Sequence, residues 1–230
     1  MNTKSSVIKG LMLNDLYNLK RSLKFLLPFF LAYGVISLTT GDFSVTTGLL
    51  TTVTVMIPLY TFSYDHANSW PNFVLSLPIR RRELVTARYL LSLFMVGCST
   101  LILLPINLIP AISGISSGEG LLILLFTVAA LLLFLSLISV CVYRFGLEHG
   151  RFIIMGICFI PFGLVLLFAK FLPAEATTAI RGWFLTRIAL GGLSFDNVLL
   201  IGSLFFLLFS ILCMWLSYRT SVRIMETREF

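Results

Sequence analysis

The sequence predicts an all-α membrane protein with six transmembrane helices, and three observations support this class. Hydrophobic residues make up 58% of the 230 residues and charged residues only 12%, whereas a soluble domain is about half apolar and a quarter charged. Six apolar stretches are each long enough, at roughly 20 residues, to cross a hydrocarbon core of about 30 Å. Almost no charge falls inside them. Because backbone amides in lipid need internal partners, these stretches must be helices.

The expected spans cover residues 22–40, 45–64, 84–110, 121–143, 152–169 and 198–218. The connections between them are too short to hold a second folded domain, so residues 1–230 are predicted to form a single transmembrane domain. The segment 171–197 is long for a connection and carries Trp183 and Phe184, which are typical of a membrane interface. We expect a re-entrant or surface helical hairpin there, with an ordinary loop as the alternative.

Before the first span, residues 5–21 are predicted to form an amphipathic helix on the membrane surface. An apolar stripe recurs at helical spacing, and polar residues fall largely between its members. The stripe consists of Ile8, Leu11, Met12, Leu16 and Leu19, and the polar residues are Lys9, Asn14, Asp15, Asn18 and Lys20. The alternative is a frayed tail.

The basic residues predict which side of the membrane each loop occupies. If the spans alternate in direction, 14 of the 17 Lys and Arg residues fall on one side, and only Lys170, Arg181 and Arg187 fall on the other. Cytoplasmic loops carry the excess of basic residues. We therefore expect both termini in the cytoplasm. The net charge of +7 is expected to interact with anionic lipid headgroups rather than with nucleic acid.

The connection between the second and third spans, residues 65–83, carries the most distinctive soluble stretch. Asn68 or Ser69 is suited to cap a short helix with Pro71 in its first turn, and Pro78 would end it. The apolar residues of this helix, Phe73, Val74, Leu75 and Leu77, need a surface to bury against. Arg80, Arg81 and Arg82 follow at headgroup height, and Glu83 suits the positive end of the third span.

The sequence lacks the residues that most membrane enzymes and pumps require. No lysine completes the glycine-rich loop that holds the phosphates of ATP. His66 and His149 lie in separate connections, and the four cysteines show neither metal-binding spacing nor a disulfide framework. The centres of all six spans lack Asp, Glu, Lys, Arg and His, although ion-driven transporters place such groups near the midplane. We expect no catalytic, cofactor or metal site, so energy for any active transport must come from another polypeptide.

The string from Leu75 to Val85, Leu-Ser-Leu-Pro-Ile-Arg-Arg-Arg-Glu-Leu-Val, is followed by Ala87, Arg88 and Tyr89. Together these residues resemble a signature of the membrane subunits of type-2 ABC exporters. The resemblance is closest to the small bacterial branch that includes the phenol-soluble modulin exporter permeases. The motif covers about 20 residues, and the helix count and N-terminal helix extend the resemblance loosely over the chain.

The resemblance implies a division of labour between subunits. Two permeases, either two copies or this chain and a sibling, would pair in the bacterial cytoplasmic membrane. Each would dock a separate ATP-binding subunit that binds ATP and Mg²⁺, and the cargo would be an amphipathic peptide or another hydrophobic compound. Docking would use the connection between spans two and three as a coupling helix, which carries Asp65, Pro71, Asn72, Phe73, Leu75, Leu77, Pro78, Arg80, Arg81 and Arg82.

Asp65 matches an acidic position that is more often Glu in that family, so its role is open. The alternative to a permease is a membrane scaffold or immunity-type protein that binds a partner and transports nothing.

Overall fold

The described part of the chain is entirely helical apart from Arg80. The computed structural model describes residues 7–20, 44–67, 80–112, 119–171 and 195–227, together with four isolated positions between residues 24 and 35. An N-terminal helix covers residues 7–20, and four longer helices follow. These are α2 (Ser44–Ala67), α4 (Arg81–Ile112), α5 (Glu119–Phe171) and α7 (Phe195–Thr227).

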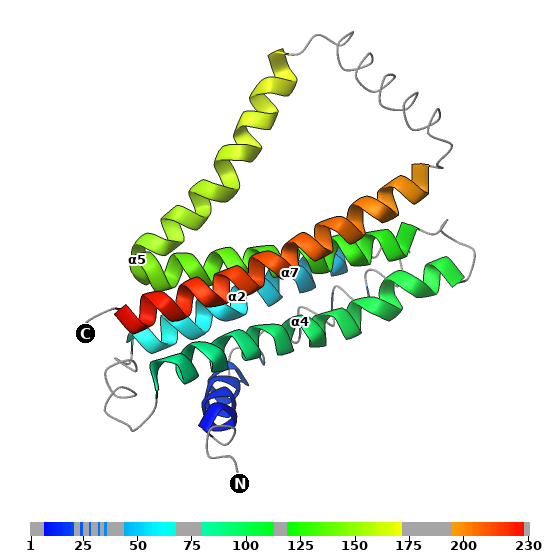
Figure 1. The fold of residues 1–230 in the computed structure, drawn as a ribbon. Coiled ribbons are helices and arrows are strands. Elements are labelled where there is room, and N and C mark those ends of the chain that lie inside the picture. The colour runs from blue at the N-terminus through cyan, green and yellow to red at the C-terminus, as the bar shows by residue number, and fades with distance from the viewer. Residues whose placement is uncertain are drawn as a thin grey trace.

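The helices α2, α4, the first half of α5 and α7 run side by side as a bundle (Figure 1). Within the described residues, three helical stretches are long and apolar enough to cross a membrane: Arg81–Asn107, Gly120–Gly150 and Asn197–Thr227. They correspond to the expected third, fourth and sixth spans. Helix α2 covers the expected second span and the end of α5 covers the fifth, while most of the expected first span lies outside the described residues.

Hydroxyl side chains are common in α2, and five of them donate to a backbone carbonyl of their own helix. Thr51 donates to the carbonyl of Thr47 at 2.6 Å, and Thr54 donates to the carbonyl of Leu50 at 2.8 Å. A hydroxyl satisfied in this way costs little in an apolar environment. The helix therefore tolerates its threonines without a solvent-facing polar surface.

The close packing of α7 against its neighbours uses small side chains and one buried tyrosine. Ser217 of α7 donates to the carbonyl of Ser136 of α5 at 2.8 Å. Its oxygen lies 2.7 Å from the hydroxyl of Tyr89 of α4, which is 2.8 Å from the hydroxyl oxygen of Ser221. Because the hydroxyl proton of Ser217 is already donated to the carbonyl of Ser136, the Tyr89 hydroxyl donates to Ser217 and accepts from Ser221. This network joins three helices inside the bundle.

The expected connection at residues 144–151 is reduced to a kink between two helical halves of α5. Helix α5 continues through it with a kink at Gly146, where φ is 80° and ψ is 176°. Only glycine adopts this backbone conformation readily. After the kink Gly150 lies against the carbonyl of Cys141, where a Cβ would be only 3.3 Å from the oxygen. A pair of glycines thus replaces the expected connection, and the second half of α5 turns away from the bundle (Figure 1).

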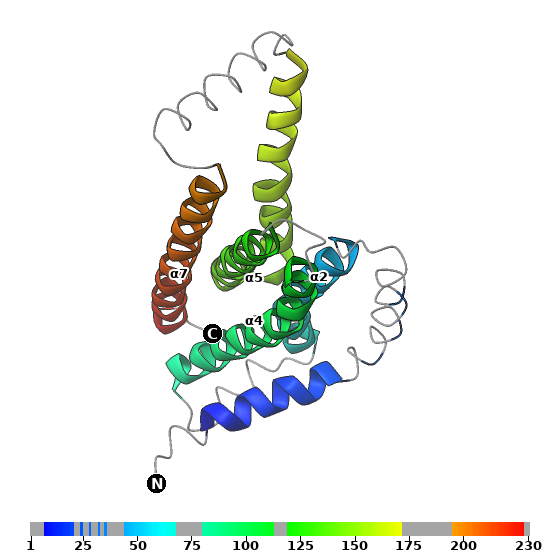
Figure 2. The same ribbon diagram turned by 90° about the vertical axis from the view of Figure 1, so that its right-hand side faces the viewer.

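The N-terminal helix lies beside the start of α4 (Figure 2) and runs across the bundle rather than along it (Figure 1), which is the direction expected of a helix at a membrane surface. Its residues Val7, Ile8, Leu11 and Met12 pack into a hydrophobic cluster with side chains from α2, α4, α5 and α7. The apolar stripe therefore meets protein along part of its length. Leu13 and Tyr17, on the opposite face, are its exposed large apolar residues.

Candidate functional site

The ends of the expected docking connection lie together at one end of the bundle, where α2 ends and α4 begins (Figure 1). Of the ten residues expected to contribute, the structure describes Asp65, Arg80, Arg81 and Arg82. The expected coupling helix, with Pro71, Asn72, Phe73, Leu75, Leu77 and Pro78, lies outside the described residues. The candidate site is therefore built from the two flanks of this connection.

The first turn of α4 shows how the chain enters the bundle. The backbone N–H of Glu83 donates to the carbonyl of Arg80 at 2.8 Å, and the N–H of Arg80 lies 3.3 Å from Oε2 of Glu83. A carboxylate at this position satisfies an otherwise free backbone donor and suits the positive end of the helix. The expectation that Glu83 stabilises this terminus is confirmed, with α4 beginning at Arg81 rather than at residue 84.

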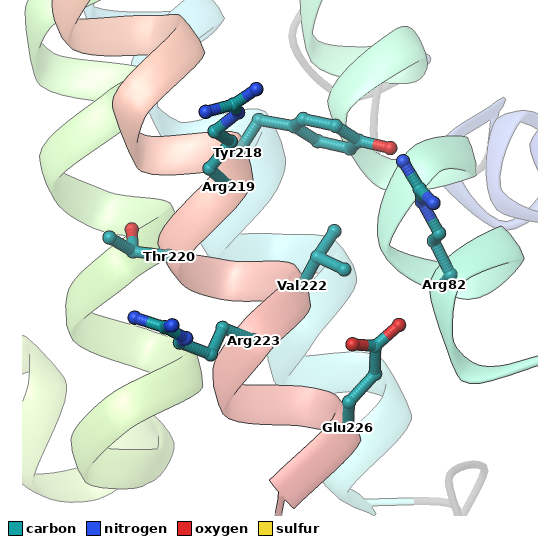
Figure 3. A pocket seen from close by; sticks show the side chains of 7 residues that line it. All are labelled: Arg82, Tyr218, Arg219, Thr220, Val222, Arg223 and Glu226. Carbon is teal, nitrogen blue, oxygen red and sulfur yellow. The ribbon is translucent and has the colours of Figure 1, made fainter.

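The three consecutive arginines face different surroundings. Arg80 is exposed at the start of the helix. Arg81 donates from Nη1 to the carbonyl of Met225 at 3.3 Å, so it ties α4 to the end of α7. Arg82 is exposed, and its guanidinium points toward the hydroxyl of Tyr218 of α7 (Figure 3). The structure therefore brings two of the three arginines against α7.

Beside this flank lies a buried charge cluster that holds three helices together. Arg88 of α4 contacts Asp15 of the N-terminal helix, with Nε 3.0 Å from Oδ2, and its Nη2 contacts Oδ2 of Asp65 at the end of α2. The side chains of Arg88 and Asp15 are each only 6% exposed, and that of Asp65 is 15% exposed. The guanidinium also lies over the ring of Phe62, 5.2 Å from its centroid. Among the buried side-chain nitrogen and oxygen atoms of the described residues, Nη1 of Arg88 is the one without a hydrogen-bond partner.

One cation shared by two buried carboxylates affects the protonation of both. The pKa of Asp65 is raised to about 6, chiefly by burial and also by the negative charge of Asp15, while Arg88 opposes both effects. Burial likewise raises the pKa of Asp15, against the attraction of Arg88. Removing charges from water favours their neutral forms unless a partner compensates. The cluster is therefore able to take up a proton under mildly acidic conditions.

Sequence reasoning found Asp65 but missed the other two members of this cluster. The sequence shows Arg88 only as a basic residue of the family motif, and Asp15 only as one of the polar residues between members of the apolar stripe. The structure corrects both points, since each residue is buried. The available signal was the spacing of Asp15, which lies four residues from both Leu11 and Leu19 and so falls on the same helix face.

Comparison with known proteins identifies the family. The model of the ABC-2 family transporter protein matches residues 10–226, which is nearly the whole chain. The chain belongs to the ABC-2 transporter family. Permeases of this family are membrane components that are not themselves catalytic, and the family implies an ATP-binding subunit as partner. Searches of curated proteins and of solved structures gave no match.

The resemblance to an ABC-2 permease expected from the motif around Pro78 is therefore confirmed at the level of the family. The assignment to the branch of the phenol-soluble modulin exporters stays a prediction. Family membership and the apolar helices together indicate a membrane protein.

Proposed function

We propose that this chain forms one transmembrane domain over residues 1–230 and is the membrane-spanning subunit of an ATP-driven exporter. Two permeases pair, and each docks a separate ATP-binding subunit through the coupling connection at residues 65–83. ATP and Mg²⁺ are bound by that partner and not by this chain. The match of the ABC-2 family model over residues 10–226 is the observation that carries the proposal.

The buried charge cluster gives the proposal a mechanical basis. The connection starts in the last turn of α2, which carries Asp65, and runs into the first turn of α4, and Arg88 joins α4 to both Asp65 and Asp15. A displacement of the connection would therefore move the ends of α2 and α4 together, and the N-terminal helix with them. Nucleotide binding shifts the equilibrium between two conformations of the complex only when these conformations differ in their affinity for the nucleotide.

The distribution of charge supports a cytoplasmic position for this end of the bundle. The first turn of α4, the kink of α5 and the end of α7 lie at the same end (Figure 1). They carry Arg80–Arg82, Arg144, and Arg219 with Arg223. Excess basic residues mark the cytoplasmic side of a membrane protein. In a bacterial plasma membrane the proposed docking face would therefore point toward the cytoplasm, where the ATP-binding subunit is located.

The cargo is proposed to be an amphipathic peptide or another hydrophobic compound. The chain has 21 phenylalanines, and the described helices expose many large apolar side chains, including Phe159, Phe205 and Phe209. Surfaces of this kind suit apolar cargo better than ions or sugars. Lipid contact accounts for the same exposure in part, so the docking step is the sharper test.

The docking proposal predicts the effect of placing charges on the apolar face of the coupling helix. Leu75→Asp combined with Leu77→Asp should abolish co-purification of the ATP-binding subunit, because a desolvated carboxylate opposes an apolar interface. Leu13→Asp makes the same chemical change at an exposed site of the N-terminal helix, so it should leave the yield of partner unchanged. Both variants are compared at equal amounts of extracted permease.

Export itself is tested with the reconstituted complex. Peptide transport into vesicles should require ATP and should be lost when the ATP site of the partner is inactivated. Wild-type recovery of the partner with the double variant would overturn the docking assignment. Partner binding without ATP-dependent transport would instead indicate a scaffold or immunity-type protein.

A further inference from the structure

An apolar groove lies between α4 and α7 on the outside of the bundle. Its volume is about 360 Å³, and its lining includes Leu90 and Leu93 of α4 and Ile211 and Trp215 of α7. These four side chains are 41–51% exposed, so the groove opens outward rather than into the core. Small-molecule sites are typically about 300–1,000 Å³ and mostly apolar. The size and chemistry of the groove suit a hydrocarbon chain.

A basic hollow continues from this groove toward the end of the bundle. It has a volume of about 440 Å³ and is lined by Arg82 of α4 and by Arg219, Arg223 and Glu226 of α7. Tyr218 borders both the groove and the hollow. Figure 3 shows Arg82 and Glu226 on the α4 side of α7, while Arg223 extends from its other side. The apolar groove thus passes directly into a polar, cationic region.

The boundary between the two regions carries the side chains expected at a membrane surface. The guanidinium of Arg219 lies over the ring of Trp215, 4.1 Å from its centroid. Tryptophan and tyrosine concentrate where hydrocarbon meets the headgroups, and arginine lies on the aqueous side of them. The hollow is therefore at headgroup height and the groove at the height of the acyl chains.

The hollow also has an excess of positive charge. Three arginines and one glutamate line it, and within the described residues no ion pair joins any of the three arginines to an acidic group. Arginine binds phosphate oxygens through paired N–H groups, and basic pockets between transmembrane helices bind anionic headgroups. A soluble anion would leave the groove empty, and a zwitterionic lipid would leave the excess charge unmatched.

We propose that this amphipathic site binds one anionic phospholipid, with its phosphate in the hollow of Arg82, Arg219 and Arg223 and an acyl chain in the groove. The lipid comes from the leaflet at this end of the bundle, which is the cytoplasmic leaflet in the proposed orientation. Of its three arginines only Arg82 is shared with the proposed docking connection, and Arg219 and Arg223 lie outside it. It would make the contact between α4 and α7 sensitive to the lipid composition of the membrane.

The test uses the fluorescence of Trp215 in the full chain. The other two tryptophans are replaced by phenylalanine, and the protein is reconstituted into phosphatidylcholine vesicles. Brominated phosphatidylglycerol or brominated phosphatidylcholine is then added at equal mole fraction, and quenching is normalised to vesicles without bromine. We expect phosphatidylglycerol to be preferred by roughly 30-fold or more, as two or three basic contacts predict.

Matched variants separate the hollow from the general positive charge of the protein. Arg219→Gln with Arg223→Gln should bring the preference close to one, and replacement of both by lysine should retain most of it. Arg144→Gln removes an exposed arginine at the same end of the bundle but outside the hollow, so it should leave the preference unchanged. Thermal melting of each variant verifies that the protein is folded.

Several results would overturn the proposal. Equal quenching by the two lipids in the parent protein would remove the anionic preference. An unchanged preference in the double glutamine variant, or an equal loss in Arg144→Gln, would mean that the hollow does not hold the headgroup. Protection of Trp215 from both lipids would indicate that a second permease covers the groove. Competition by inorganic phosphate at millimolar concentration would identify a soluble anion as the ligand.

Discussion

Replacing Arg88 with methionine removes the cation from the buried cluster and keeps much of its volume. Asp15 and Asp65 are then left close together without a compensating charge, and Asp15 has almost no access to water. Such carboxylates become neutral instead of remaining charged. Protonating an aspartate with a pKa of about 3.9 at pH 7 costs about 4 kcal/mol, and breaking buried pairs by removing one partner typically costs about 3–5 kcal/mol.

The expected loss of stability is therefore about 3–5 kcal/mol at pH 7. For a chain of this length, each kcal/mol lowers the melting temperature by about 2–4 °C, which gives a decrease of about 6–20 °C. The assay is thermal unfolding in detergent, followed with a thiol-reactive dye that reports exposure of the buried Cys141. Arg144→Met makes the same change at an exposed arginine, and should change stability by no more than about 0.5 kcal/mol.

Two further measurements test the stated cause of this loss. The penalty of Arg88→Met should shrink at pH 5, because protonating each carboxylate then costs less. The triple variant with Asp15→Asn and Asp65→Asn should recover much of the stability, since uncharged replacements of buried ion pairs are often neutral. A melting temperature for Arg88→Met within about 2 °C of the wild type at pH 7 would refute the reasoning, because the predicted minimum is about 6 °C.

Three other changes follow from single features of the structure. Because the pKa of Asp65 is raised in the folded protein, its protonation stabilises the fold fully below the ordinary pKa of an aspartate, and this contribution is lost as the pH rises through about 6. The melting temperature should therefore increase when the pH is lowered from 7 to 5, and Asp65→Asn should reduce this increase. Gly146→Ala should cost about 1–3 kcal/mol because of its positive φ, whereas Gly163→Ala, at a helical glycine with open space around it, should not lower the melting temperature. Tyr89→Phe removes the hydroxyl that joins α4 to α7 and should cost about 0.6 kcal/mol, with about 1.7 kcal/mol as an upper value; a variant as stable as the wild type would show that the network contributes nothing.

The sequence by itself determined the class of the protein and the family. Long apolar stretches have few stable solutions in lipid, so composition and length predict helices directly. The motif that ends near Arg88 and Tyr89 pointed to the ABC-2 permeases, and the family match agrees with it. Both signals are local in the chain, which is why they were readable without coordinates.

Tertiary structure decided the features that depend on contacts between distant segments. Arg88 belongs to the family motif, and its burial between Asp15 and Asp65, which lie 73 and 23 positions earlier in the chain, is a feature that no local pattern shows. The connection expected at residues 144–151 became a kinked helix because Gly146 permits an unusual φ and Gly150 permits close approach. Periodicity and charge describe one segment at a time, whereas burial of an ion pair and the path of a backbone depend on which segments meet.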